Sequence, residues 1–272
     1  MSSLSLPLSS TKTSLKPLFF PLHKPRHQQL QNPNLSPSTL SLSSPNNRIP
    51  RLSLSNQDTP VSAIPIQEIV EKDWSFVDSD SINSPSERSH KTSRIISAAR
   101  IGPSSRILVS HGTEHFVEQL VGSGEPSGKK PFELLLVVHE SLFELALIKE
   151  KFDDGVRCWQ GGILEVPQKW ANFDAVFICY LPGLGFSTDQ IFAAMGRRCS
   201  PGARLVIGYA QGREIVARHL QQHPDMVNSA LPDKATLEKV AADHSFEVTE
   251  FVDEPTFYLA VLEFCKLGNS DK

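Results

Sequence analysis

Short apolar runs alternate with amphipathic stretches through the middle of the chain. The runs at 106–110, 132–138, 156–159, 173–179 and 203–208 are mostly apolar, as in RILVS and FELLLVV. Helical periodicity marks the stretches between them, at 116–121, 141–151 and 188–197. Strands that are apolar on both faces and separated by helices are typical of a parallel sheet. The pattern therefore predicts an α/β fold with helices on both faces of a mostly parallel sheet.

The C-terminal part of the chain departs from this alternation. After a helix expected at 234–243, two strands at 246–251 and 256–264 are separated by only a short turn. A turn of that length permits an antiparallel pair and excludes a parallel one. The sequence therefore predicts that a C-terminal antiparallel hairpin closes the sheet.

The chain before the first strand divides into a leader, a linker and the start of the domain. Residues 56–87 are expected to form a linker in which 64–74 can hold a short helix, and the stretch at 78–91 is polar. A short helix at 93–99 precedes the first strand, and Gly102-Pro103 ends it. The folded domain is expected at 88–268.

The first 57 residues contain no Asp or Glu, and Asp58 is the first acid of the chain. The same stretch carries the basic residues Lys12, Lys16, Lys24, Arg26, Arg48 and Arg51. A Ser-rich, basic and acid-free N-terminus is typical of an organelle transit peptide. Because the basic residues are sparse beside Ser and Pro, we expect residues 1–55 to direct the protein to the chloroplast stroma. The alternative is an ordinary disordered Ser/Pro tail.

Charge and cysteine content exclude several classes of protein. The formal net charge is −3, and without residues 1–55 the chain is slightly acidic. This charge argues against broad nucleic-acid binding, which depends on neutralising phosphates. The sequence has no run of about 20 apolar residues, the length that a transmembrane helix needs. The four cysteines form no CxxC pair, so we expect reduced thiols and neither a disulfide nor a zinc framework.

Three segments carry a resemblance to a known family. They are FDAVF at 173–177, SPGARLVI at 200–207 and LPD at 231–233, which opens the last expected helix. Together they resemble the class I S-adenosylmethionine-dependent methyltransferases, especially the type that methylates quinones and other small molecules. The resemblance covers about residues 88–266. It implies a Rossmann-like fold, S-adenosylmethionine as the cofactor and a small or hydrophobic acceptor.

The family's glycine-rich turn is largely missing here. In the family this turn follows the first strand and lets the backbone approach the cofactor closely. The matching residues are Ser110, His111 and Gly112, followed by Glu114 and His115, so a single glycine is left. The acid that the family carries at the end of the strand is absent as well. The resemblance places Ser110, His111 and Gly112 at the cofactor. The side chains of His111, Glu114 and His115 would crowd its methionine moiety.

One polar cofactor contact of the family is retained. The family's second strand ends in an acid that holds both ribose hydroxyls, and Glu140 matches it. A carboxylate suits this role because it can accept two hydrogen bonds from a diol. An equally good interpretation is that Glu140 stabilises the N-terminus of the following helix through the helix dipole.

The adenine side and the acceptor side offer apolar candidates. Gly162 stands where the family has an acid, and the neighbouring Ile163 and Leu164 can pack against an adenine ring or belong to the core. Tyr180, just after the fourth strand, is expected to line the acceptor pocket, with simple packing as the alternative.

Histidines follow the first two strands. His111, His115 and His139, together with Glu114, are expected at the sheet edge where open α/β sheets bind ligands. Imidazole and carboxylate groups suit zinc or iron. A loop imposes no fixed geometry on this spacing, however, so we expect no metal and interpret these residues as loop histidines.

Two functions of different classes follow from these residues. The first is a chloroplast S-adenosylmethionine-dependent methyltransferase that acts on a small or hydrophobic acceptor. The second is a catalytically inactive relative that serves as a binding or assembly module for a protein partner. Glu140 favours the first, and the degraded glycine turn favours the second.

Overall fold

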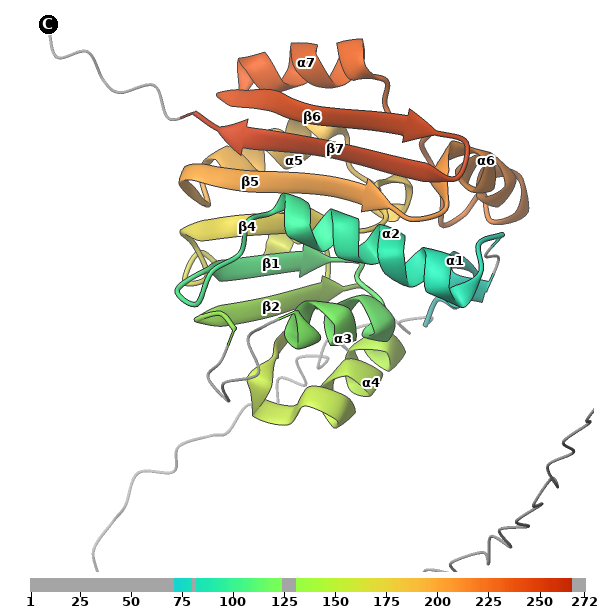
Figure 1. Ribbon diagram of the computed structural model, residues 1–272, viewed down its shortest axis with the longest axis horizontal. Helices are drawn as coiled ribbons and strands as arrows, with labels where there is room; N and C mark the ends of the chain where they lie inside the picture. The colour runs from blue at the N-terminus through green and yellow to red at the C-terminus, as the bar shows by residue number, and fades with distance from the viewer. Residues whose placement is uncertain (1–70, 80–81, 124–130, 266–272) are drawn as a thin grey trace, which may run out of the picture. The chain divides into compact units, whose positions relative to one another are not determined.

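Seven strands form one sheet in the order β3-β2-β1-β4-β5-β7-β6 (Figure 1). The computed structural model describes residues 71–79, 82–123 and 131–265. The strands are β1 (Arg106–Ser110), β2 (Leu134–His139), β3 (Arg157–Gln160), β4 (Phe173–Ile178), β5 (Cys199–Tyr209), β6 (Phe246–Glu254) and β7 (Phe257–Phe264). The transit peptide expected at 1–55, the linker residues 56–70 and residues 266–268 of the expected domain lie outside the described residues.

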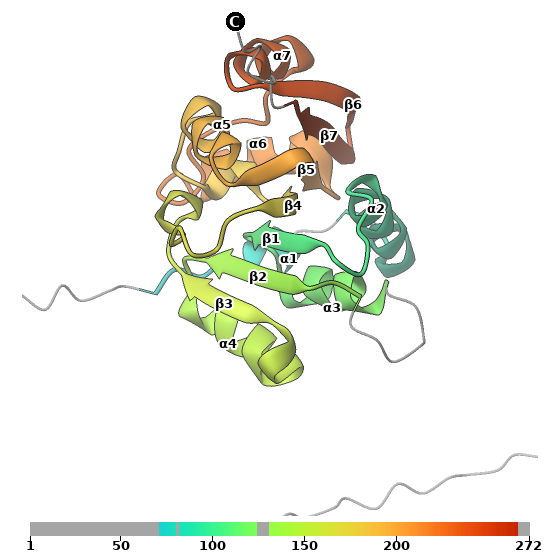
Figure 2. The same cartoon turned by 90° about the vertical axis from the view of Figure 1, so that its left-hand side faces the viewer.

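The pairing of the strands confirms the predicted fold class. Strands β1 to β5 pair in parallel, as β2–β3, β1–β2, β1–β4 and β4–β5. Strand β7 runs antiparallel to both β5 and β6, and only Pro255-Thr256 separates β6 from β7. A link of this length can only form a hairpin. The result is a mostly parallel, Rossmann-like sheet with a C-terminal antiparallel hairpin, stacked from β3 to β6 as Figure 2 shows.

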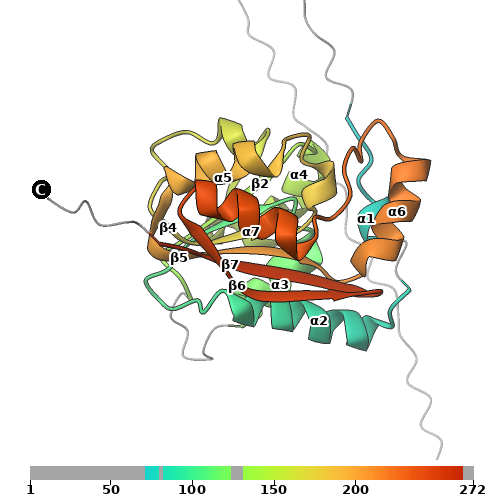
Figure 3. The same cartoon turned by 90° about the horizontal axis from the view of Figure 1, so that it is seen from above.

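Helices cover both faces of the sheet, as the view from above shows (Figure 3). They are α1 (Phe76–Ser79), α2 (Pro85–Ala98), α3 (Glu114–Gly122), α4 (Leu142–Phe152), α5 (Thr188–Gly196), α6 (Gly212–Gln222) and α7 (Lys234–Asp243). Single 3-10 turns occur at η1 (Asp153–Gly155), η2 (Ile163–Glu165) and η3 (Leu181–Gly183). Apolar residues of α2, α3 and α4 share one core cluster, and those of α5, α6 and α7 share the other. None of the helices in the described ranges combines the length and apolarity needed to cross a membrane.

The central strands contribute side chains to both core clusters. In β1, Ile107 and Val109 pack in one cluster and Leu108 packs in the other, and all three are fully buried. Because successive side chains of a strand point to opposite faces, a strand covered on both faces must be apolar throughout. The continuous apolar runs of the sequence therefore reflect the position of these strands in the middle of the sheet.

The N-terminal part of the fold differs from the sequence prediction. Helix α2 begins at Pro85, eight positions before the helix expected at 93–99, and so occupies much of the polar stretch at 78–91. Ser84 caps it, since its Oγ accepts a hydrogen bond from the Glu87 amide at 3.2 Å, and proline suits the first helical position. The first two turns are mostly exposed, which is why they resemble a linker in the sequence.

The residues ahead of α2 also belong to the folded unit. Residues 71–74, the described end of the short helix considered for 64–74, are not helical, and α1 follows them at Phe76. Trp74, Phe76 and Val77 are buried within the core cluster of α5, α6 and α7. Hydrophobic contact with the strand ends, rather than helical periodicity, orders this segment.

Helix α6 is absent from the sequence prediction. Its buried face is formed by Ile215 and Val216 with His219. Gly212 opens the helix with φ +73, and a Cβ there would lie 2.4 Å from the carbonyl oxygen of Pro255. Glycine at this position therefore lets α6 pack against the turn between β6 and β7.

Replacing Gly212 by Ala is expected to lower the free energy of unfolding by about 2 kcal/mol or more, because the left-handed backbone and the close carbonyl oxygen both oppose a Cβ. Urea unfolding followed by circular dichroism measures the change. Gly102→Ala is the matched control, since no atom lies within 4 Å of a Cβ there. Equal losses in the two variants would contradict this account of α6.

Candidate functional site

The carboxyl ends of β1, β2 and β4 bring three polar rings together. His111 follows β1, His139 ends β2 and Tyr180 lies just after β4, and each ring is buried. The ring centroids of His111 and His139 are 4.6 Å apart. His111 has φ +53, a left-handed conformation that costs free energy in any residue but glycine. Such strain is common at ligand sites, and open α/β sheets bind ligands at this edge.

Residues 71–79, here called the covering segment, lie across this edge. Figure 1 shows its helix α1 beyond the ends of the parallel strands. The indole of Trp74 is 5% exposed and meets the rings of His111 and His139 edge to face, with centroids 5.0 and 5.7 Å away. Gly183 makes room for it, because a Cβ at that position would lie 2.6 Å from the indole. The segment therefore fills the edge with one of its own rings.

Two residues, Glu71 and Lys72, attach the start of the covering segment to residues 140–143, here called the rim. The Lys72 ammonium lies 3.2 Å from the Glu140 carboxylate, and both side chains are partly exposed. The Glu71 carboxylate accepts hydrogen bonds from the Ser141 hydroxyl at 2.5 Å and from the Phe143 amide at 3.1 Å. These two hydrogen bonds lower the pKa of Glu71, the one from Ser141 most of all. Glu140, the carboxylate expected at the ribose, is thus paired with a cation from the chain itself.

The other end of the covering segment contacts α6. The Phe76 ring stacks on His223 with centroids 4.0 Å apart and meets His219 at 4.8 Å. Beneath it, the Tyr180 hydroxyl lies 2.8 Å from Nδ1 of His219, and both side chains are fully buried. Tyr180 therefore belongs to a hydrogen-bonded pair inside the core, and residues 71–79 shield it from solvent.

Burial sets the protonation states of the ionisable side chains at the carboxyl ends of the strands. Desolvation holds the pKa of His111 well below its usual value and lowers that of His139 to about 4. It also raises the pKa of the Tyr180 hydroxyl and of the Asp78 carboxyl, the latter against a hydrogen bond from Thr113. Both imidazoles are therefore neutral near pH 7, which leaves each with one nitrogen that can accept a hydrogen bond.

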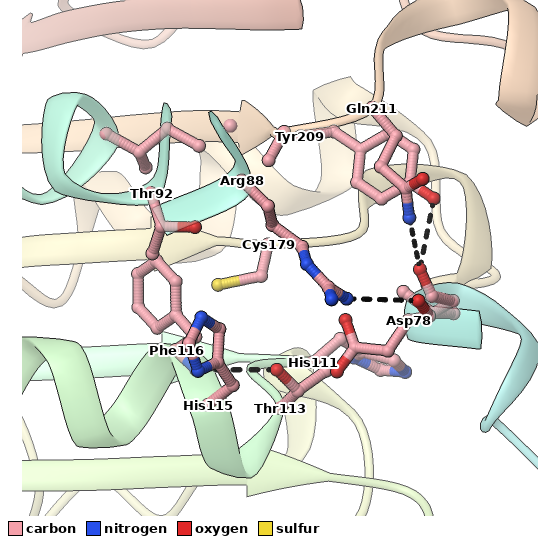
Figure 4. Close-up of a pocket in the computed structure, with 14 residues that line it drawn as sticks. Asp78, Arg88, Thr92, His111, Thr113, His115, Phe116, Cys179, Tyr209 and Gln211 are labelled. Carbon is pink, nitrogen blue, oxygen red and sulfur yellow. Dashed lines mark hydrogen bonds between the residues drawn. The ribbon is translucent and has the colours of Figure 1, made fainter. Parts of the chain in front are cut away.

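Two small cavities among the described residues adjoin the strand ends while the covering segment is in place. One of about 50 Å³ is surrounded by Asp78, Arg88, His115 and Cys179, as Figure 4 shows, and a second holds about 10 Å³ beside Trp74. Pockets for ligands of cofactor size measure roughly 300 Å³ or more. An open groove of about 320 Å³ lies between residues 71–75 and the start of α4, next to the end of β2. S-adenosylmethionine therefore does not fit either of the two small cavities while residues 71–79 are in place.

The geometry of the turn after β1 explains why it keeps one glycine. A Cβ on Gly112 would lie 2.4 Å from a methyl carbon of Val109, so the tight turn needs glycine whatever it binds. Ser110 is fully buried, with its hydroxyl 3.4 Å from Nδ1 of His111. Thr113 and Glu114 begin α3, and Glu114 pairs with Lys151 on α4.

The two residues predicted to pack on an adenine ring, Ile163 and Leu164, differ in their burial. Ile163 is fully buried within the core cluster, whereas Leu164 is half-buried beside it. The Gly162 amide donates to the Glu165 carboxylate at 3.1 Å, and the ring of Phe186 lies against Gly162. The polar and aromatic contacts of this loop are therefore made with other residues of the same chain.

The histidines do not assemble into a metal site. Within the described ranges, no three His, Cys, Asp or Glu side chains form a group that could hold a metal ion. The structure brings His111 and His139 together, but Nε2 of His115 lies 2.9 Å from the Gln119 amide nitrogen instead. His111 and His139 are buried, so the interpretation of both as exposed loop histidines is wrong.

Sequence reasoning missed the covering segment and the partner of Tyr180. Trp74 and Phe76 are two aromatic residues in a stretch that is otherwise polar except for Val77, and this was the available signal. His219 and His223 lie about forty positions after Tyr180, and only the packing of α6 brings them to the edge.

Acidification is expected to destabilise the fold through the buried histidines. The pKa of His139 is about 4 in the folded protein and near 6.5 in an unfolded chain, so below pH 6.5 the unfolded state binds an extra proton. The free energy of unfolding should therefore fall as the pH drops toward 4, by up to about 1.4 kcal/mol per pH unit from this residue, and His111 acts in the same direction.

Urea unfolding at several pH values between 7.5 and 4.5 measures this slope. The variant His139→Gln should show a shallower decline than the unmodified protein. His90→Gln, which changes an exposed histidine of α2, serves as the control and should leave the slope unchanged. Parallel curves for all three proteins would refute the role given to His139.

Comparison with known proteins identifies the fold. No family model and no curated protein matches the sequence. A chain of the complex between the Haloferax volcanii Trm112 methyltransferase activator and a candidate methyltransferase superposes with a TM-score of 0.55, at 10% identity over 66% of this chain and 91% of that one. Geranyl diphosphate C-methyltransferase from Streptomyces coelicolor gives 0.52 at 11% identity, over 65% and 80% of the two chains. N-methyltransferase NodS from Bradyrhizobium japonicum gives 0.50 at 13% identity, over 67% and 99%.

Identities this low establish the fold alone. Each of the three superpositions covers about two thirds of this chain. This chain therefore has a class I methyltransferase-like fold.

Proposed function

We propose that this protein is an S-adenosylmethionine-dependent methyltransferase-like protein whose cofactor edge is closed by residues 71–79. In its open form it would transfer a methyl group to a small or hydrophobic acceptor held beside Tyr180. The observation that supports this most directly is the state of Glu140. This carboxylate stands at the rim, 32% exposed, and its ion pair with Lys72 is of the kind that breaks easily.

The way residues 71–79 are attached agrees with an edge that can open. Among the described residues, every backbone–backbone hydrogen bond of this segment stays within the segment, from Trp74 to Ser79. No strand pairing has to break when Trp74 leaves the edge. When bound, S-adenosylmethionine supplies the methyl group. The closed form assigns no residue to a further step of that reaction.

A second candidate function is a binding or assembly module that does not catalyse methyl transfer. The filled edge and the buried, strained His111 in the glycine turn favour it. The neighbour from Haloferax volcanii belongs to a complex with a methyltransferase activator, so a protein is a reasonable class of partner for such a module.

Titration calorimetry with S-adenosylmethionine separates the two candidates. We expect saturable binding by the full chain, about twofold to fivefold tighter in Lys72→Ala, because an exposed ion pair contributes up to about 1 kcal/mol. Glu140→Ala should weaken binding about tenfold, since a hydrogen bond to a charged group contributes roughly 1.5 kcal/mol or more.

Lys234→Ala is the control, because it breaks an exposed ion pair with Glu238 on α7, far along the chain from Glu140. It should leave the affinity unchanged. The absence of both heat and thermal stabilisation at millimolar S-adenosylmethionine, in the unmodified protein and in Lys72→Ala, would reject the methyltransferase proposal in favour of the binding module.

We also propose that the protein works in the chloroplast stroma, on the composition of residues 1–55. Fused to a fluorescent protein, residues 1–55 should direct the fusion into chloroplasts and be removed there. A fusion of residues 56–272 should stay in the cytosol. Cytosolic fluorescence from the first fusion would reject this location.

A further inference from the structure

We propose that the sheet edge is a binding site for a planar nitrogen heterocycle and that the indole of Trp74 is its built-in occupant. A ring ligand and the docked covering segment would then exclude one another. This inference goes beyond methyl transfer, because it depends on the shape and the polar atoms of the site and not on which cofactor carries the ring.

The enclosure of Trp74 has the shape of a slot for a flat ring. His111, His139 and Tyr180 stand nearly perpendicular to the indole, at interplanar angles of 77°, 89° and 76°. Gly183 lies so close that no larger residue could stand beside the ring. Edge-to-face contacts of this kind stabilise an aromatic ring through its quadrupole, whichever molecule carries it.

The polar atoms of the slot are not matched to an indole. Within the described structure, Nε1 of Trp74 and Nε2 of His111 are buried and have no hydrogen-bond partner. A buried polar group without a partner costs free energy, and such groups are rare in folded proteins. The two rings are 5.0 Å apart at their centroids, yet neither nitrogen pairs with the other. A ring that carries both donors and acceptors could pair with His111 where the indole does not.

Trp74 can leave the strand ends while α1 keeps its contacts with the rest of the protein. The carbonyl oxygen of Val77 accepts hydrogen bonds from the Gln211 amide at 2.8 Å and the Tyr209 hydroxyl at 3.3 Å, which hold α1 on the far side of Ser75. On the near side, only the rim contacts of Glu71 and Lys72 join residues 71–73 to other parts of the described chain by hydrogen bonds or ion pairs. The segment therefore has a firm end and an end that can detach.

The variant Trp74→Ala, made in the full chain, tests the proposal with indole and adenosine as probes. Removing the ring should lower the melting temperature by about 5 °C or more. Millimolar indole or adenosine should restore part of this loss by filling the slot, as ligands fill engineered cavities. By calorimetry, adenosine should bind the variant at least about tenfold more tightly than the unmodified protein, because no docked ring competes.

Two further variants serve as controls. Trp170→Ala removes an indole that packs edge to face on Trp159 beside β3, and the ring ligands should not restore its stability. The double variant Glu71→Ala, Lys72→Ala keeps Trp74 but removes the rim contacts. It should bind adenosine at least about threefold more tightly than the unmodified protein and be cleaved by proteases near residue 73 when adenosine is present.

The outcomes separate this inference from the methyltransferase proposal. Failure of both rings to stabilise Trp74→Ala more than Trp170→Ala would overturn it, as would equal affinity of the unmodified protein and the two edge variants for adenosine. Should Trp74→Ala not fold, the double variant decides by the same comparison. Adenosine binding to Trp74→Ala without any response to S-adenosylmethionine would support the slot and reject methyl transfer.

Discussion

The indole of Trp74 lies where β1, β2 and β4 end, and the rest of the edge is arranged around it. It makes edge-to-face contacts with His111 and His139, and both imidazoles are buried. That burial keeps both rings neutral and lowers the pKa of His139 to about 4. The packing of Trp74 on the two imidazoles thus accompanies their neutral state and their exclusion from solvent.

The contacts around Trp74 connect distant parts of the chain. Phe76 extends the aromatic contact to α6, where His219 is hydrogen-bonded to Tyr180. Lys72 pairs with Glu140, the residue that the sequence predicts at the cofactor's ribose. The functional question therefore reduces to whether residues 71–79 leave the edge. An edge that opens suits a cofactor-dependent enzyme, and an edge that stays filled suits a binding module.

The fold could be predicted because its signals are local and repeated. Apolar runs such as Leu134–His139 and Phe173–Ile178 mark buried strands, and the two-residue link before β7 permits only a hairpin. The sequence prediction was wrong where polar residues lie within a helix or at its start. The exposed first turns of α2 resemble a linker, and the buried face of α6 includes the polar residue His219.

The sequence by itself determined the α/β architecture, since this depends on neighbouring residues, and it predicted from single positions that the glycine turn is degraded and that Glu140 contacts the ribose. Only the tertiary structure decided the state of the site. Contacts between Trp74 and His111, or between Tyr180 and His219, join residues 37 and 39 positions apart. No local pattern encodes such contacts, because they form only when the sheet brings the strand ends together and burial then fixes the protonation of the rings.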